Sequence, residues 1–137
     1  MSIFRTLLRS KIQHVTVTRS DVYCEGSLVV DPALLEAAHI CPFEQVEIVD
    51  ATNGQHLETY VLAGARGSGE IQINGAAARL VLAGELVSIL AYDQITDPLP
   101  EEWNPRVVLV TPQNHIRDVR SLCLHGGSTV LRPNSVC

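Results

Sequence analysis

Three Gly-Ser pairs occur in this chain of 137 residues, and such a pair can carry out chemistry on its own backbone. If the serine hydroxyl adds to the preceding carbonyl, the peptide bond becomes an ester. Elimination then breaks the chain, and hydrolysis leaves a ketone, the pyruvoyl group, at the new N-terminus. The reaction needs a turn that the surrounding fold holds in a strained geometry. The pairs are Gly26-Ser27, Gly67-Ser68 and Gly127-Ser128.

The neighbours of each pair indicate which turn a fold could strain. Gly127-Ser128 falls in the last stretch, which we expect to be a tail, and Gly67-Ser68 lies in "ARGSGE", where the glycines allow a bend. Strand-like residues flank Gly26-Ser27 closely in "VYCEGSLVVD", so a core could lock this turn. An ordinary tight turn is the alternative interpretation, and the local residues alone favour it.

The chain around these pairs is patterned mainly as β-strands. In "HVTVT", Val15 and Val17 fall on one face and the polar residues on the other, as in a half-buried strand. "TNG" at 52–54 has the composition of a hairpin turn between two such runs. This density of short strands is typical of a small barrel. Strands are predicted at 14–18, 45–50, 57–64, 70–74, 86–92 and 106–111.

Helices are expected to be few and short. Asp31 is a suitable N-cap for "DPALLEAAHI", and Pro32 suits the first helical position. A second, shorter helix is predicted in "GAAARLV", after the start of that segment at Gly75. Residues 96–105 contain three prolines and the only tryptophan, and we predict a loop there.

Length and composition predict one folded domain at residues 1–112, followed by a weakly patterned and partly mobile C-terminal extension at 113–137. The chain is 46% apolar and 18% charged, which is typical of globular rather than disordered proteins. A net charge of −5 argues against nucleic-acid binding, which needs clustered Lys and Arg. No apolar stretch is long enough to span a membrane and no signal peptide is evident, so we expect a cytoplasmic protein.

The side chains that bind metals and organic cofactors are scattered along the chain. The four cysteines include no Cys-x-x-Cys pair and the five histidines show no metal-ligand spacing, so no metal site is expected. Pyridoxal phosphate needs a lysine amine, and Lys11 is the only lysine. No Gly-rich loop that could hold a phosphate leads into a helix. The sequence therefore predicts neither a metal nor pyridoxal phosphate.

Four segments occur in the order and at the spacing of the pyruvoyl-dependent aspartate 1-decarboxylases: "YCEGSLVVD", "TNG", "ETY" and "RGSGEIQINGAAARLVLAGELV". From about Arg5 to about Pro112 the chain resembles this family. The resemblance implies a small double-psi β-barrel with one or two short helices, and a homotetramer whose sites lie between neighbouring subunits. It also implies a covalent pyruvoyl group as cofactor and the conversion of L-aspartate to β-alanine and carbon dioxide.

The resemblance assigns chemical roles by position. Gly26 and Ser27 match the self-cleavage pair, and Ser27 would become the pyruvoyl group. Thr59 matches a threonine that assists processing, and Tyr60 matches the tyrosine that protonates the carbanion after carbon dioxide leaves. The ketone would react with the substrate amine and accept the electrons of the departing carboxylate. Whether cleavage needs a helper protein is open.

The resemblance also assigns residues to substrate binding. Lys11 matches the lysine near the substrate carboxylate, and Asn74 matches the residue that orients the carbonyl of the pyruvoyl group. Gly75, Ala76 and Ala77 match the backbone that lines the substrate pocket.

The chain departs from the family pattern mainly where a substrate carboxylate is recognised. His56, beside Gln55, stands where the family usually has an arginine, so the bidentate guanidinium is missing. Cys24, Gln13 and Val49 replace a tyrosine, a histidine and a pocket aromatic. These changes affect the expected substrate more than the expected reaction.

Three functions therefore stand after the sequence analysis. In the first, the protein decarboxylates L-aspartate, with Lys11 and protonated His56 doing the work of the missing arginine. In the second, the pocket has been retuned to another amino acid, because the loss of an arginine penalises a dicarboxylic substrate. In the third, the barrel never cleaves and serves as a binding or assembly protein. Processing of Ser27 separates the third from the others.

Overall fold

The computed structural model describes residues 3–122, which are mainly β, as predicted. The strands, the α-helix and the 3-10 helix are, in chain order, β1 (Phe4–Thr16), β2 (Arg19–Asp21), β3 (Ser27–Val30), α1 (Pro32–Ala37), β4 (Gln45–Asp50), β5 (His56–Ala63), β6 (Ile71–Asn74), η1 (Gly75–Arg79), β7 (Leu86–Thr96), β8 (Arg106–Val110) and β9 (Ile116–Ser121).

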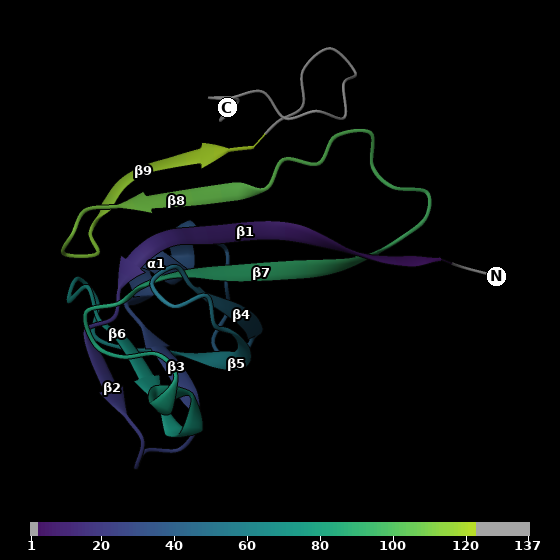
Figure 1. Ribbon diagram of the computed structural model, residues 1–137. Coiled ribbons are helices and arrows are strands. Elements are labelled where there is room, and N and C mark those ends of the chain that lie inside the picture. Colours follow the sequence, from purple (N-terminus) through teal and green to yellow (C-terminus); the bar gives the residue numbers. More distant parts are fainter. Residues whose placement is uncertain (1–2, 123–137) are drawn as a thin grey trace.

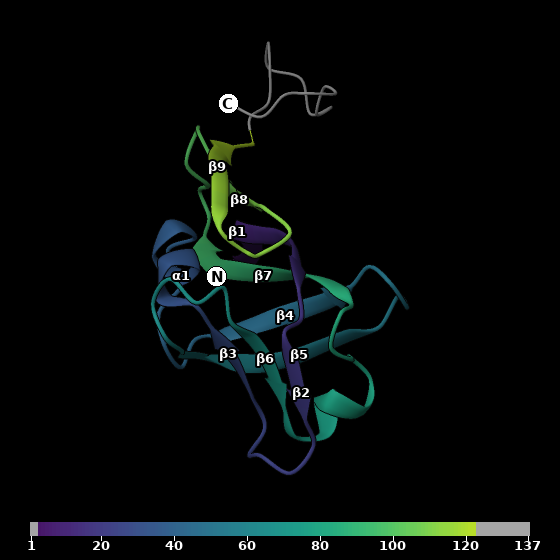
Figure 2. The same ribbon diagram turned by 90° about the vertical axis from the view of Figure 1, so that its left-hand side faces the viewer.

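The nine strands are hydrogen-bonded in the order β2-β6-β3-β5-β4-β7-β1-β8-β9. Three neighbouring pairs run parallel, β2 with β6, β3 with β5 and β1 with β8, while the other pairs are antiparallel. Strands β1, β7, β8 and β9 form one end of the molecule, and β2, β3 and β6 form the other (Figures 1 and 2). Strands distant in sequence are therefore neighbours in space.

The core is built from the alternating apolar residues of these strands. Val15 and Val17 are buried as the pattern at 14–18 predicted, although β1 begins at Phe4 and ends at Thr16. The pairing of β1 with β7 shifts between Ile12 and Val15, and His14 there adopts a positive φ of 52°. Fully buried side chains of the core include Ile12, Leu28, Leu34, Ile48, Ile71, Ile73 and Ile89.

The predicted turn at 52–54 joins β4 and β5 as an antiparallel hairpin. The Asp50 carboxylate accepts the backbone N–H of Thr52 at 2.7 Å and that of Asn53 at 3.2 Å. Gly54 completes the turn at a φ of +78°, a conformation that glycine adopts without a steric cost. The hairpin brings His56 to the beginning of β5, opposite Val49 of β4.

Asp31 is the N-cap of α1, as predicted, and it also holds the turn before β6. Its carboxylate accepts the N–H of Ala33 at 2.9 Å, of Gly67 at 3.1 Å and of Gly69 at 2.9 Å. Burial opposes ionisation, but these three donors outweigh it and lower the pKa of Asp31. The Gly67-Ser68 turn is thus tied to the end of β3. The second predicted helix is also present, as the short η1.

The prediction of a weakly patterned extension from residue 113 is wrong for residues 113–122. β9 pairs antiparallel with β8 in this region. Asn114 is 2% exposed, and its amide Nδ2 donates to the carbonyls of Thr16 and Gly69, both at 2.8 Å. A buried asparagine that satisfies two distant carbonyls makes this segment part of the fold. Residues 123–137, including Gly127-Ser128, lie outside the described residues.

No helix within residues 3–122 is both long enough and apolar enough to cross a membrane.

Candidate active site

Strand pairing places Ser27 between two of the residues that the sequence singled out. On one side, Ser27 is the direct antiparallel partner of Asn74 in β6. On the other side, β3 runs parallel to β5 with Leu28 opposite Val61, so Ser27 and Tyr60 each come one residue earlier on neighbouring strands. Ser27, Asn74 and Tyr60 thus occupy three adjacent strands.

The polar residues of this group lie on the face of the sheet that points away from the core. Leu28, Ile73 and Val61 are fully buried in the core. Because successive side chains of a strand alternate between faces, Ser27 and Asn74 point to the opposite side. Both remain shielded there, with exposed fractions of 4% and 6%. A nearly buried serine hydroxyl therefore depends on protein partners rather than water.

Ser27 takes part in a chain of hydrogen bonds. Asn74 Nδ2 donates to Ser27 Oγ at 3.0 Å, and the Ser27 hydroxyl donates to the carbonyl of Glu25 at 3.3 Å. At the other end, Gln72 Nε2 donates to Asn74 Oδ1 at 2.7 Å. The Ser27 side chain therefore points back over the turn that carries the Gly26–Ser27 bond, with an amide donor on its oxygen.

Residues 22–26 form a turn between β2 and β3, exposed from Tyr23 to Gly26, at the lower end of the molecule in Figures 1 and 2. Asp21 holds the start of this turn by accepting the N–H of Tyr23 at 3.0 Å and the thiol of Cys24 at 3.2 Å. The Tyr23 N–H and the Cys24 thiol lower the pKa of Asp21, and the same carboxylate raises the pKa of the Cys24 thiol. Cys24 is therefore a proton donor in the turn and not a thiolate.

The other end of the turn rests on Gly75. Gly75 adopts a φ of +77°, and a Cβ at this position would lie 2.6 Å from Gly26 Cα and 2.9 Å from Gly26 N. No side chain fits there without moving the turn. Gly75 thus allows the backbone of the predicted cleavage site to pack directly on the end of β6. Ala76 and Ala77 follow in η1, the first exposed and the second half-buried.

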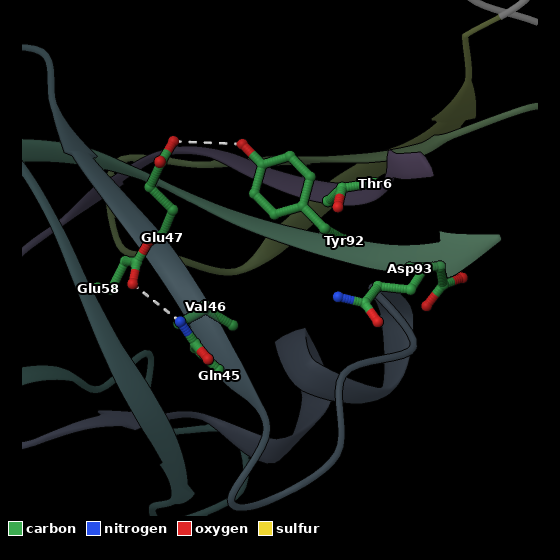
Figure 3. Close-up of a pocket in the computed structure, with 8 residues that line it drawn as sticks. Thr6, Gln45, Val46, Glu47, Glu58, Tyr92 and Asp93 are labelled. Carbon is green, nitrogen blue, oxygen red and sulfur yellow. Dashed lines mark hydrogen bonds between the residues drawn. The ribbon is translucent and has the colours of Figure 1, made fainter. Parts of the chain in front are cut away.

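Thr59 and Tyr60 line a cavity of about 360 Å³ together with Gln45 and Glu58. A second cavity of about 270 Å³ shares Gln45 and Glu58 and continues over β4 and β7 to Tyr92. The Tyr92 hydroxyl donates to Glu47 at 3.2 Å, and Gln45 donates to Glu58 at 2.9 Å; Figure 3 marks both hydrogen bonds with dashed lines. Burial, followed by the charge of Glu47, raises the pKa of Tyr92. The two cavities adjoin on the outside of the barrel.

Neither Lys11 nor His56 is a strand-pairing partner of Ser27. Lys11 is on β1, paired with Leu90 and Val107, and β1 is four strands from β3 in the sheet order. His56 is on the same strand as Tyr60 but four residues earlier, about 13 Å at the usual rise of a strand. Within residues 3–122, no hydrogen bond or salt bridge joins either one to Ser27.

Comparison with known proteins identifies the family. The family model described as aspartate decarboxylase matches residues 3–117. This chain belongs to the aspartate decarboxylase family. It is also 49% identical over 119 residues to the aspartate 1-decarboxylase of Neisseria meningitidis (serogroup C / serotype 2a), covering 87% of this chain and 94% of that protein. The resemblance found in the sequence is confirmed.

Two designed proteins of known structure are also similar to this aspartate decarboxylase family member. The rationally designed mkDPBB_sym_86 protein is 16% identical with a TM-score of 0.43, and the match covers 56% of this chain and 90% of that one. The computationally designed msDPBB_sym2 protein is 15% identical with a TM-score of 0.44, covering 65% and 96%. The double-psi β-barrel is the fold that family membership implies for the mainly β structure described above.

Sequence reasoning missed two residues of this family member's site. Gln72 contacts Asn74, and Asp21 holds the start of the turn at 22–26, where cleavage is predicted. The signal for Gln72 was its position two residues before Asn74, which puts both on one face of a strand. Asp21 gave only the weak signal of an acidic residue that can accept N–H groups just after it.

No group of three or more His, Cys, Asp or Glu side chains placed to hold a metal occurs in the described part of the chain. Cys24 and Cys41 are free and exposed. Cys123 and Cys137 lie outside the described residues.

Proposed function

We propose that this protein cleaves itself between Gly26 and Ser27 and then decarboxylates L-aspartate to β-alanine and carbon dioxide. The observation that carries the proposal is the hydrogen bond of 3.0 Å from Asn74 to Ser27 Oγ, made beside an exposed turn that rests on Gly75. Membership of the aspartate decarboxylase family supports the same reaction.

Cleavage begins when Ser27 Oγ attacks the carbonyl carbon of Gly26. The C–N bond between the two residues breaks as an ester C–O bond forms, and the proton of the hydroxyl moves to the released amine. Elimination of the Gly26 carboxylate leaves dehydroalanine at position 27. Water then hydrolyses this residue, which releases ammonia and leaves a ketone.

The residues around Ser27 fit this chemistry. The Asn74 amide donates to Ser27 Oγ, so it stabilises the negative charge on this oxygen while the hydroxyl loses its proton. The Ser27 hydroxyl already points toward the turn, since it donates to the carbonyl of Glu25. Gly75, which has no side chain, leaves room for Gly26. Thr59 is assigned to processing by the family resemblance alone.

The pyruvoyl group made from Ser27 supplies an electron sink for the loss of carbon dioxide from an amino acid bound through its amine. Tyr60, which lines an open cavity with Thr59, is the proposed proton donor to the carbon that loses carbon dioxide. Asn74, Gly75, Ala76 and Ala77 hold and orient the reacting groups.

The proposed assembly is a homotetramer with sites between neighbouring subunits. Its support is the separation of Lys11 and His56 from Ser27 within one chain, which leaves the carboxylate-binding side of the site to a neighbour. The proposed location is the cytoplasm, and a helper protein for maturation is a further proposed partner.

The decisive experiment is the intact mass of the purified protein under denaturing conditions. The proposal predicts two fragments, a chain ending at Gly26 and a longer chain whose N-terminal carbonyl reacts with hydroxylamine. Incubation with L-aspartate should then release carbon dioxide and β-alanine in equal amounts. A single intact chain with a free Ser27 would instead support a barrel without this enzymatic activity.

His56 favours a second candidate, a decarboxylase of another amino acid. The imidazole is exposed at the beginning of β5 and cannot make the two parallel hydrogen bonds of an arginine. A panel of amino acids decides between the candidates. If a neutral amino acid is turned over much faster than L-aspartate, the assignment of aspartate as substrate fails while the chemistry at Ser27 stands.

A further inference from the structure

Gln72 is the only side chain in the described structure that donates a hydrogen bond to Oδ1, the oxygen of the Asn74 side-chain amide. The two residues are two apart on β6, so their side chains share a face, and Gln72 is half-buried. Gln72 Nε2 lies 2.7 Å from Asn74 Oδ1, and Asn74 Nδ2 lies 3.0 Å from Ser27 Oγ.

A primary amide has a donor end and an acceptor end of nearly equal size. Packing alone therefore discriminates weakly between the two orientations of Asn74, and its hydrogen-bond partners decide which end faces Ser27. While Gln72 keeps Nε2 toward Asn74, a rotation of half a turn would place Oδ1 against Ser27 Oγ and the Asn74 amino group against Gln72 Nε2, donor facing donor. Because Asn74 is 6% exposed, that mismatch has little water to relieve it.

The orientation matters because the Ser27 hydroxyl has a single proton. That proton is directed to the carbonyl of Glu25, so Ser27 Oγ needs a donor on its other side. The donor end of Asn74 stabilises the oxygen as it loses its proton. The acceptor end would hold the proton on Ser27 instead and would repel the developing charge.

We propose that Gln72 is a positioning residue for self-cleavage, which keeps the donor end of the Asn74 amide on Ser27 through the hydrogen bond from Gln72 Nε2 to Asn74 Oδ1. The inference rests on the proposed cleavage at Gly26–Ser27. Gln72 does not touch the bond that breaks and acts only through Asn74.

Two substitutions of similar size separate this role from simple packing. Gln72→Glu places an ionised carboxylate, an acceptor only, opposite Asn74 and favours the reversed amide. Gln72→Met removes the polar group, so that the side chain at position 72 favours neither orientation of the Asn74 amide. A packing role predicts similar rates for both variants, whereas the proposed role predicts that Gln72→Glu is slower.

Of the two strands paired with β6, only β2 places charged residues opposite Gln72 and Asn74. Arg19 is paired with Gln72 and Asp21 with Asn74, while the facing residues of β3 are the uncharged Val29 and Ser27. Arg19 could attract the introduced carboxylate away from Asn74. The decisive comparison is therefore made in the Arg19→Gln background, where the remaining charge on β2 opposite this pair is Asp21.

Cleavage is followed by intact mass at set times after cell-free synthesis of the full chain. At pH 8 we expect Gln72→Met to cleave about tenfold more slowly than the parent and Gln72→Glu about a hundredfold more slowly. As the pH falls to about 4.5, the introduced carboxyl gains a proton and becomes a donor, so the rate of Gln72→Glu relative to the parent should recover about tenfold.

Cleavage of Gln72→Glu at pH 8 as fast as that of Gln72→Met, or a relative rate that does not recover at low pH, would overturn the role of Gln72. A wild-type chain that stays intact would overturn the proposed function instead. In that case NMR decides the role of Gln72. Nuclear Overhauser contacts from the Asn74 amino protons to the Ser27 β-protons should be present in the wild type and lost in Gln72→Glu, and their persistence in the variant would contradict the proposal.

Discussion

The turn at residues 22–26 and the β7–β1–β8 part of the sheet assemble polar side chains in different ways. At the turn, Ser27 and Asn74 are nearly buried and hydrogen-bonded to each other. In the β7–β1–β8 part of the sheet, Arg9 forms ion pairs with Glu44 and Asp93, and Lys11 makes no ion pair in the described structure. One chain thus places the groups for backbone chemistry but not the cation expected to hold the substrate.

The difference follows from how each kind of contact is specified. The partners at the turn lie on adjacent, paired strands, so the backbone hydrogen bonds of the sheet set their positions. A lysine acts through a long and flexible stem and can reach into a neighbouring subunit. Self-cleavage should therefore depend on contacts within one chain, and substrate preference on groups farther from the turn. Four substitutions test this comparison.

Ser27→Ala should have the largest effect, the complete loss of both cleavage and decarboxylation, because it removes the attacking oxygen. Intact mass and carbon dioxide release measure the two results. Ser68→Ala is the matched control, since it removes the hydroxyl of another Gly-Ser pair and should leave both unchanged. A processed and active Ser27→Ala variant would move the cleavage site elsewhere.

Gly75→Ala should slow cleavage by about a hundredfold, because the new Cβ would lie 2.6 Å from Gly26 Cα and displace the turn. Gly84→Ala is the control. Gly84 also has a positive φ, of 91°, but has no atom within 4 Å of the added Cβ. This control should lose about 1 kcal/mol of stability and cleave normally. Equal cleavage rates for the two variants would show that the contact with Gly26 is unimportant.

Asp31→Ala should lower the free energy of unfolding by about 2 kcal/mol at pH 7, because three backbone N–H groups lose their acceptor. Asp31 lies at the far end of β3 from Ser27, so cleavage should remain close to normal. Urea unfolding followed by circular dichroism measures the change.

The Asp31 carboxylate also makes the free energy of unfolding depend on pH. The folded-state pKa of Asp31 is lowered, so its carboxylate stabilises the folded protein above its unfolded-state pKa, and this stabilisation disappears as the pH falls through the folded-state value. The stability difference between the wild type and Asp31→Ala should therefore shrink in acid. Asp31→Asn keeps an N-cap but has no such titration. A difference that stays constant down to about pH 2 would contradict this cause.

His56→Arg should have the smallest effect, an increase of about tenfold in kcat/KM for L-aspartate, because a guanidinium can bind a carboxylate with two hydrogen bonds. Cleavage should not change, since His56 lies four residues before Tyr60 on β5 and is not part of the turn at residues 22–26. Gln55→Arg adds the same charge next to it as a control. An unchanged preference in His56→Arg would show that the substrate carboxylate is held elsewhere.

Local patterns were enough to predict much of the fold. The hairpin of β4 and β5 and the cap of α1 depend on residues close together in sequence, Asp50 to Gly54 and Asp31 to Ala33. β2 and β9 gave no such pattern. β2 has three residues, too few for a period to appear, and β9 is an edge strand whose side chains are mostly exposed.

The sequence by itself determined the family, the mainly β composition and the serine at which cleavage is proposed, because short motifs and alternating apolar residues are local properties. Only the tertiary structure decided that Gln72 donates to Asn74, that the backbone of Gly75 packs against Gly26 and that Lys11 pairs with Leu90 and Val107. Period two assigns a side chain to a face, but the neighbouring strand and its register come from contacts between distant segments. The partners of Ser27 follow from that register.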